Sequence, residues 1–135
     1  HAPTPLYAGL HVFSNGQPEE SWFKTERLRG RLRQEILPLI SENSDARYWQ
    51  TAALEVLSDM TQAPTEKLPD TGVDIKVEQA LSSIYIEGVN LLGVANANNA
   101  MPSYGTRTQS VLTLRKNTGS GTGIQAEIVS RECTH

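Results

Sequence analysis

The stretch "RKNTGSGTGIQAEIV", residues 115–129, places glycines at three alternate positions, Gly119, Gly121 and Gly123. Such a segment can hold a phosphate group when it follows a strand and opens a helix, because free amides and the helix dipole then face the anion. After Gly123, however, apolar and polar side chains alternate, which is the pattern of a strand. No Lys-Ser or Lys-Thr follows the last glycine. The stretch therefore predicts a hairpin bend between two strands.

Alternation with period two predicts five strands, of which the last two are the arms of this hairpin. One covers "PLYAGLHVF" at residues 5–13, near the beginning of the chain. Four more follow the connector "TQAPTEKLPDTG", whose prolines and Pro-Asp-Thr-Gly turn mark a change in the character of the chain. We expect them at residues 73–78, 82–89, 111–115 and 124–129.

Two amphipathic helices are predicted between the first strand and the connector. The first covers residues 22 to about 37, where Pro38 ends or kinks it because proline lacks the amide hydrogen and crowds the preceding turn. Its apolar arc comprises Trp22, Leu28, Leu32, Ile36 and Ile40. The second covers residues 46 to about 60, with Asp45 or Ser44 as its cap.

These elements predict the α+β class: an N-terminal strand, two amphipathic helices, then a mostly antiparallel sheet of about four strands. A chain of 135 residues is close to the commonest size of a single domain, so residues 1–135 are expected to form one compact unit. Hydrophobic residues make up 38% of the chain and charged residues 20%, as in ordinary globular proteins.

Composition also excludes several function classes. The apolar runs are far shorter than the ~20 residues of a membrane span, so none is expected. A net charge of -3 gives no reason to expect nucleic acid as a partner. The chain lacks the H-E-x-x-H, G-x-S-x-G and C-x-x-C motifs. We therefore expect no cofactor, no metal and no catalytic residue.

The compartment is predicted from the beginning of the chain. It opens with "HAPTPL" and without methionine, which is typical of a processed N-terminus and indicates a secreted or periplasmic protein. The single cysteine, Cys133, cannot form an internal disulfide and is read as a free thiol.

The best candidate contact surface is a long loop at residues 93–110, which is rich in asparagine. Loops of this length in compact domains are usually functional or disordered. Asparagine and tyrosine combine adaptable hydrogen bonding with a stiff ring, a mixture typical of loops that recognise proteins or glycans. The predicted binding residues of this loop are Asn96, Asn98, Asn99, Tyr104 and Arg107.

A basic face on the first helix is a second candidate surface. Lys24, Arg27 and Arg31 share this face, and Arg27 and Arg31 are the predicted binding residues. Glu35 stands four residues after Arg31, which gives local pairing and leaves a solvated helix face as the alternative.

The resulting functional hypothesis is a non-enzymatic secreted or periplasmic interaction module, of the envelope assembly, secretion or adhesion accessory type. Its long loops would bind another protein or a glycan, and identical copies would associate through a sheet edge. The alternative is a small enzyme or copper-binding protein with a site around Tyr7, His11 and His1, since a terminal amine and imidazole can chelate copper. Tyr104 and Arg107 are the further polar groups of an enzymatic site, and His135 is a further candidate ligand.

Overall fold

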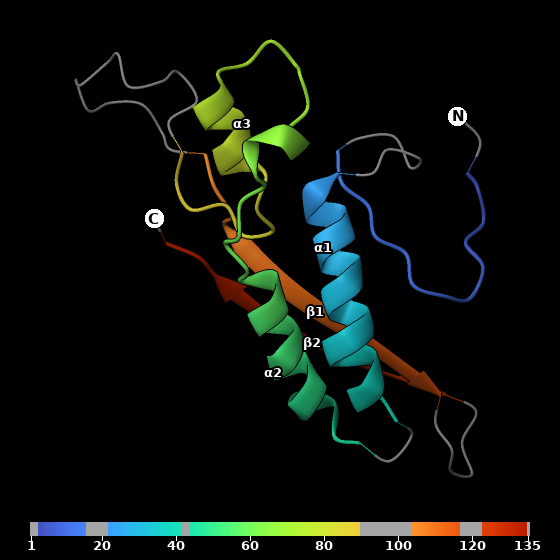
Figure 1. The fold of residues 1–135 in the computed structure, drawn as a ribbon. Coiled ribbons are helices and arrows are strands. Elements are labelled where there is room, and N and C mark those ends of the chain that lie inside the picture. Colours follow the sequence, from blue (N-terminus) through green and yellow to red (C-terminus); the bar gives the residue numbers. More distant parts are fainter. Residues whose placement is uncertain (1–2, 16–21, 42–43, 90–103, 117–122, 135) are drawn as a thin grey trace.

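The computed structural model describes residues 3–15, 22–41, 44–89, 104–116 and 123–134. Helices α1 and α2 lie side by side on one face of a two-stranded antiparallel sheet, and α3 lies beyond one end of the sheet (Figure 1). No helix in the described part of the chain has the length and apolarity of a membrane span. The bounds are α1 Phe23–Arg31, α2 Ala46–Leu57, α3 Ile75–Leu81, β1 Thr108–Lys116 and β2 Ile124–Glu132. The α+β class with an antiparallel sheet is confirmed.

The first predicted helix is present, but its regular part is shorter than expected. After α1 the helix first widens, in a π-helical turn at Leu32–Ile36, and then tightens, in a 3₁₀ turn at Leu37–Leu39 that contains Pro38. Proline supplies no amide hydrogen, so the α-helical ladder cannot continue past this point. Ile36 is buried, whereas Ile40, at the end of the predicted apolar arc, is exposed.

The second predicted helix, α2, is confirmed. Asp45 caps it, since its Oδ1 accepts a hydrogen bond of 2.9 Å from the Arg47 amide. The buried face of α2 contributes Ala53 and Val56 to the hydrophobic core, where they meet Ile36. Leu28, Leu32, Ala52 and Val111 pack against this cluster. The core therefore lies between the two helices and β1.

The predicted glycine hairpin is confirmed as a pair of antiparallel strands. Residues 108–116 pair with 124–132, so that Leu112 stands opposite Ile128 and Leu114 opposite Ala126. Gly123 is followed by a strand and not by a helix, so it opens no helical anion site. Gly119 and Gly121 lie outside the described residues.

The sheet presents its polar face to the helices. Gln50 Nε2 of α2 donates to Thr113 Oγ1 at 2.8 Å, and Gln109 Nε2 donates to the Leu57 carbonyl at 2.6 Å. Arg115 Nη2 reaches the Ser44 carbonyl at 2.5 Å. Hydrogen bonds therefore join the hairpin to α2, and Val111 on the same face packs against the core. The other aliphatic side chains of β1, Leu112 and Leu114, point the other way and are exposed.

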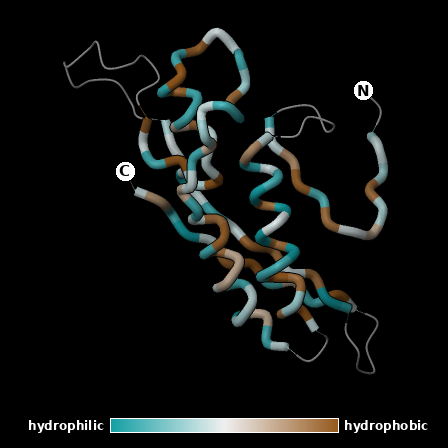
Figure 2. Tube along the Cα trace, viewed as in Figure 1, coloured by the Kyte–Doolittle hydropathy of each residue, from teal (hydrophilic) through white to brown (hydrophobic). Residues whose placement is uncertain are grey.

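Two of the predicted strands are wrong. Residues 5–13 form no strand, although apolar positions recur along them (Figure 2). Tyr7 is 83% exposed, and Leu6 and Phe13 are also exposed. No described neighbour offers this segment a hydrogen-bonding ladder, and alternation without a partner does not make a strand.

Residues 73–78, the other incorrect strand, belong largely to α3. Asp74 Oδ1 accepts from the Lys76 amide at 2.8 Å and begins the helix. Val77 is buried while Ile75 is exposed. The cap at Asp74 therefore favours a helix here, although apolar and polar residues alternate at positions 73–78.

The predicted strand at 82–89 is reduced to a single bridge between Val89 and Tyr104. Turns and bends occupy the residues before it. The described part of the chain therefore contains two extended strands, and the expected sheet of about four strands is not observed there.

Candidate functional site

A cavity of about 580 Å³ lies beside the start of α1. This volume falls within the ~300–1,000 Å³ that is typical of small-molecule sites. Its wall is contributed by the beginning of α1, the segment at 63–71, and α3 with the residues that follow it, together with residues 14–15 and Tyr104. The larger apolar and aromatic side chains of the described lining are Trp22, Phe23, Leu68, Leu81, Ile86 and Tyr104.

The helical wall of the cavity is fixed by Thr25 in the first turn of α1. Its hydroxyl accepts a hydrogen bond of 3.1 Å from the Trp22 amide and donates one of 2.9 Å to the Trp22 carbonyl. Thr25 is itself buried. This local closure holds Trp22 and Phe23 at the edge of the cavity.

The opposite wall is joined by hydrogen bonds between the 63–71 segment and α3. Ser82 Oγ accepts from the Ala63 amide at 2.7 Å, and Gln79 Nε2 donates to the Ala63 carbonyl at 3.2 Å. Ala63 is buried. The two segments thus form one continuous surface that carries Leu68 and Leu81.

The third side is closed by pairing of the 86–89 segment with residues 104–106. Thr106 donates its amide to the Ile86 carbonyl at 2.9 Å, and Val89 and Tyr104 exchange amide hydrogen bonds of 2.7 and 2.8 Å. This pairing places Tyr104 against the cavity, where Ile86 is the most buried of the larger apolar lining residues.

Lys24 is the half-buried cation of the cavity lining. Burial lowers the pKa of its ammonium group from the ordinary value of 10.5, because the charged form loses hydration. Within the described residues, no carboxylate lies within ion-pairing distance of Lys24. Glu66, Lys67 and Glu78 also line the cavity, and Glu66 and Lys67 are exposed. A negatively charged group in the cavity would therefore complement Lys24.

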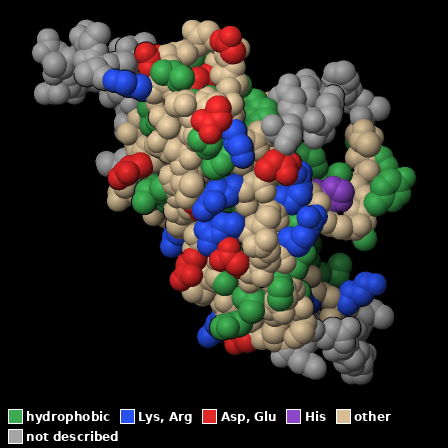
Figure 3. Space-filling model, viewed as in Figure 1, with side chains coloured by type: hydrophobic (Ala, Val, Ile, Leu, Met, Phe, Trp, Pro, Cys, Tyr) green, Lys and Arg blue, Asp and Glu red, His purple; other side chains and the backbone are tan. Residues whose placement is uncertain are grey.

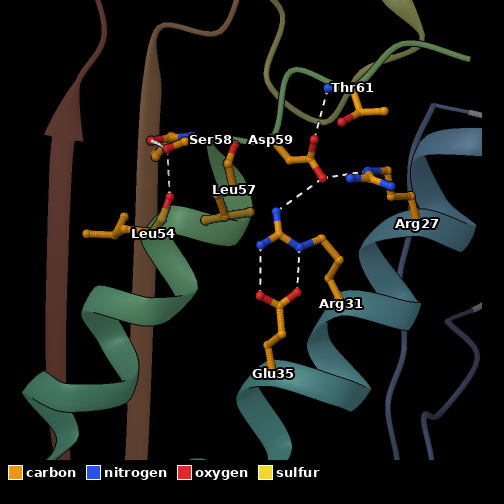
Figure 4. A network of polar contacts seen from close by, with 9 residues as sticks. Arg27, Arg31, Glu35, Leu54, Leu57, Ser58, Asp59 and Thr61 are labelled. Atoms are coloured by element: carbon orange, nitrogen blue, oxygen red, sulfur yellow. Dashed lines mark hydrogen bonds and ion pairs between the residues drawn. The ribbon is translucent and has the colours of Figure 1, made fainter.

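The neighbouring cations of α1 have a different role. Figure 3 shows lysine and arginine side chains gathered with carboxylates at the centre of the helical face. Asp59, just after α2, accepts hydrogen bonds from Arg27 Nε at 2.5 Å and from Arg31 Nη1 at 3.1 Å (Figure 4). The Thr61 amide donates to the other carboxylate oxygen at 2.9 Å. These contacts tie α1 to the end of α2.

The pKa of Asp59 agrees with its role in joining α1 to the end of α2. Burial alone would raise the pKa of Asp59, whose side chain is only 4% exposed, but the hydrogen bonds from Thr61, Arg27 and Arg31 outweigh it and hold the pKa well below its usual range. Arg31 also makes two parallel hydrogen bonds to Glu35, at 2.6 and 2.8 Å. The hydrogen bond from Arg31 lowers the pKa of the Glu35 carboxyl group.

The structure separates the residues that the sequence predicted as one basic face. Arg27 and Arg31 bind Asp59 within the chain, whereas Lys24 lines the cavity. Of the predicted loop residues, Tyr104 also lines the cavity. Arg107 is exposed, and its carbonyl accepts from the Cys133 amide at 2.6 Å. Asn96, Asn98 and Asn99 lie outside the described residues, so their binding role stays a prediction.

The contacts described at the alternative site around Tyr7 and His11 join residues of one short segment. His11 Nε2 donates to the Tyr7 carbonyl at 2.8 Å, and its ring stacks on Phe13 with centroids 6.3 Å apart. Among the described residues, no group of three or more His, Cys, Asp or Glu side chains is arranged to hold a metal ion. His1 and His135 lie outside the described residues.

The sequence analysis missed the cavity and most of its lining. The chain offers one local signal, the consecutive Trp22, Phe23 and Lys24, in which two bulky rings precede a cation at the start of a helix. That signal does not reveal the other walls, because Leu68 lies in the predicted connector and Leu81 lies between two predicted strands.

Comparison with models of protein families shows what the chain is similar to. The model of a protein family described as TANGO2, Transport and Golgi organisation 2, matches residues 1–127. No curated protein and no solved structure matches the chain. The family description concerns transport and Golgi organisation, so the hypothesis of a secreted or periplasmic envelope module is wrong, and so is the predicted compartment.

Proposed function

Because the chain belongs to the TANGO2 family, Transport and Golgi organisation 2, we propose that it serves transport by holding a small, largely apolar anion in the cavity beside Lys24. The observation that carries this proposal is the meeting of an aromatic and aliphatic lining with a half-buried cation that pairs with no carboxylate in the described structure. A site of this kind takes molecules with an apolar body and one negatively charged group.

The apolar body of the ligand would contact Trp22 and Phe23 on one side and Leu68 and Leu81 on the other. These four side chains are half-buried, and Trp22 and Phe23 come from a different segment than Leu68 and Leu81, so a molecule between them would be enclosed from two directions. Removal of apolar surface from water contributes roughly 25 cal/mol per Å². This contribution supports binding of aliphatic or aromatic molecules without selecting among them.

The charged group of the ligand would contact the Lys24 ammonium. Partial burial of a lysine is unfavourable unless an anion accompanies it, and the described protein supplies none at this position. An anionic ligand would restore the lost electrostatic stabilisation. Selectivity for anions over neutral molecules of the same shape would therefore reside in Lys24.

A pair of matched ligands tests the proposal. Octanoate and octanol share an aliphatic chain and differ in charge, and their dissociation constants can be measured by isothermal titration calorimetry. We expect octanoate to bind more tightly than octanol by roughly tenfold, as a charge-assisted contact implies. Lys24→Met should abolish this difference while preserving the length of the side chain.

Two control variants complete the experiment. Lys76→Met removes an exposed lysine of α3 that does not line the cavity, and it should leave both affinities unchanged. Leu81→Glu places a carboxylate in the apolar lining and should weaken both ligands. Absence of binding by either ligand, or binding that Leu81→Glu does not affect, would contradict the proposed cavity function.

A further inference from the structure

The face of the hairpin that points away from the helices is apolar and uncovered in the described structure. Leu112, Leu114, Ile124 and Ile128 on this face are between 61% and 70% exposed. The strand register places Leu112 opposite Ile128 and Leu114 opposite Ala126, so these side chains form one continuous patch. Large uncovered apolar patches are typical of interaction surfaces.

Charged and polar residues limit this outer face at its two ends. At one end Thr108 pairs with Glu132, and the Thr108 hydroxyl lies 3.3 Å from a Glu132 carboxylate oxygen. At the other end Lys116 pairs with Ile124. All of these residues share the outer face, because alternate positions of a strand point to the same side. Lys116 and Glu132 are both exposed.

The outer face is therefore complementary to itself. Eight residues of extended chain, about 27 Å, separate its cationic end from its anionic end. Rotation by 180° about an axis that lies parallel to the sheet and perpendicular to its strands turns the face over and exchanges these two ends. A second, identical face turned in this way would bring its Lys116 to the end of the first face that carries Glu132, and its Glu132 to the end that carries Lys116.

We propose that two copies of this 135-residue chain associate face to face through the outer surfaces of their hairpins. Sheets that pack in this manner lie about 10 Å apart, with their strands rotated by about 30°. The aliphatic patches of both copies become the interior of a four-layered dimer, in which the helices form the outer layers. Each copy uses the same residues, as a twofold interface requires.

This interface differs from association through a sheet edge, which the sequence led us to expect. An edge-to-edge dimer would extend the sheet by backbone hydrogen bonds and would leave Leu112, Leu114, Ile124 and Ile128 exposed. Face-to-face association removes these four side chains from water in both copies at once. The hydrophobic effect therefore favours the face over the edge.

Analytical ultracentrifugation of the 135-residue chain over a range of concentrations tests the proposal. We expect a reversible dimer. Leu114→Lys introduces a cation at the centre of the patch, so it should make the chain monomeric. Circular dichroism verifies that this variant is folded. A wild-type chain that stays monomeric, or a dimer that Leu114→Lys does not weaken, would overturn the proposal.

Charge reversal provides a second test that leaves the apolar patch intact. Each single variant, Lys116→Glu or Glu132→Lys, sets like charges against each other at both ends of the dimer and should weaken dimerisation roughly tenfold. The double variant K116E/E132K restores opposite charges and should recover the wild-type affinity. Failure of the double variant to recover would exclude this relative orientation of the two copies.

Discussion

Gln50 of α2 and Thr113 of β1 are joined by a hydrogen bond of 2.8 Å between two side chains that are 6% and 5% exposed, respectively. The bond determines which face of the hairpin the helices cover. A buried amide without a partner is unfavourable, so the face that carries Thr113 must meet α2. The aliphatic face consequently points outward, and it is this orientation that creates the proposed dimer surface.

Thr113→Val should destabilise the chain by about 1 to 3 kcal/mol, because the buried Gln50 amide loses its partner while the volume at residue 113 hardly changes. Urea denaturation followed by circular dichroism measures this change in the free energy of unfolding. The double variant Q50L/T113V removes both polar groups and should recover most of the loss. If the double variant is less stable than Thr113→Val, the hydrogen bond is not the cause.

Asp59→Asn should destabilise the chain by about 1.5 to 3 kcal/mol at neutral pH, because Arg27 and Arg31 lose a buried charged acceptor. The depressed pKa of Asp59 makes this contribution dependent on pH. It is complete above the unfolded value of about 3.8 and is lost as the pH falls below it. The difference in unfolding free energy between wild type and variant should therefore stay constant above about pH 4 and shrink as the pH falls from there towards the depressed pKa of the folded state.

Glu35→Gln is the matched control for Asp59→Asn. It removes a carboxylate that also binds Arg31, but Glu35 is exposed to solvent, where ion pairs contribute little. Its effect on the unfolding free energy should be much smaller than that of Asp59→Asn. Equal effects of the two variants would show that burial of Asp59 is unimportant.

Lys24→Met should leave the chain at least as stable as wild type at neutral pH, because it removes a partly buried charge. The folded-state pKa of Lys24 lies below its unfolded value of 10.5, so the unfolded state binds more protons between these two values. The wild type should therefore gain stability relative to Lys24→Met as the pH rises through this window. Urea denaturation at several pH values measures the effect, and a lower stability of Lys24→Met at neutral pH would show that Lys24 has a structural role.

Tryptophan fluorescence should report ligand binding through Trp22 and not through Trp49. Trp22 lines the cavity, whereas Trp49 is buried on α2 and is not part of the described lining. Trp49→Phe loses no hydrogen bond, since Trp49 Nε1 has no partner in the described structure. Octanoate should change the emission of Trp49→Phe and should leave that of Trp22→Phe unchanged. The opposite result would place the ligand elsewhere.

Several elements of the fold could be predicted because their signals are local. The cap at Asp45 and the apolar spacing after it determine α2, and alternation after Gly123 determines β2. Similar local alternation at residues 5–13 and 73–78 predicted strands that do not form. A strand needs a neighbouring strand, and a short alternating stretch cannot say whether one exists.

The sequence by itself determined the two amphipathic helices, the antiparallel hairpin and the membership of a family, since each depends on the order of residues along the chain. The tertiary structure alone decided that Lys24 faces a cavity while Arg27 and Arg31 bind Asp59, and that the hairpin turns its polar face to α2. The physical reason is that burial, charge pairing and the lining of a cavity depend on contacts between segments that lie far apart in sequence. Lys24 and Leu81, which line one cavity, are separated by 57 positions (81 − 24).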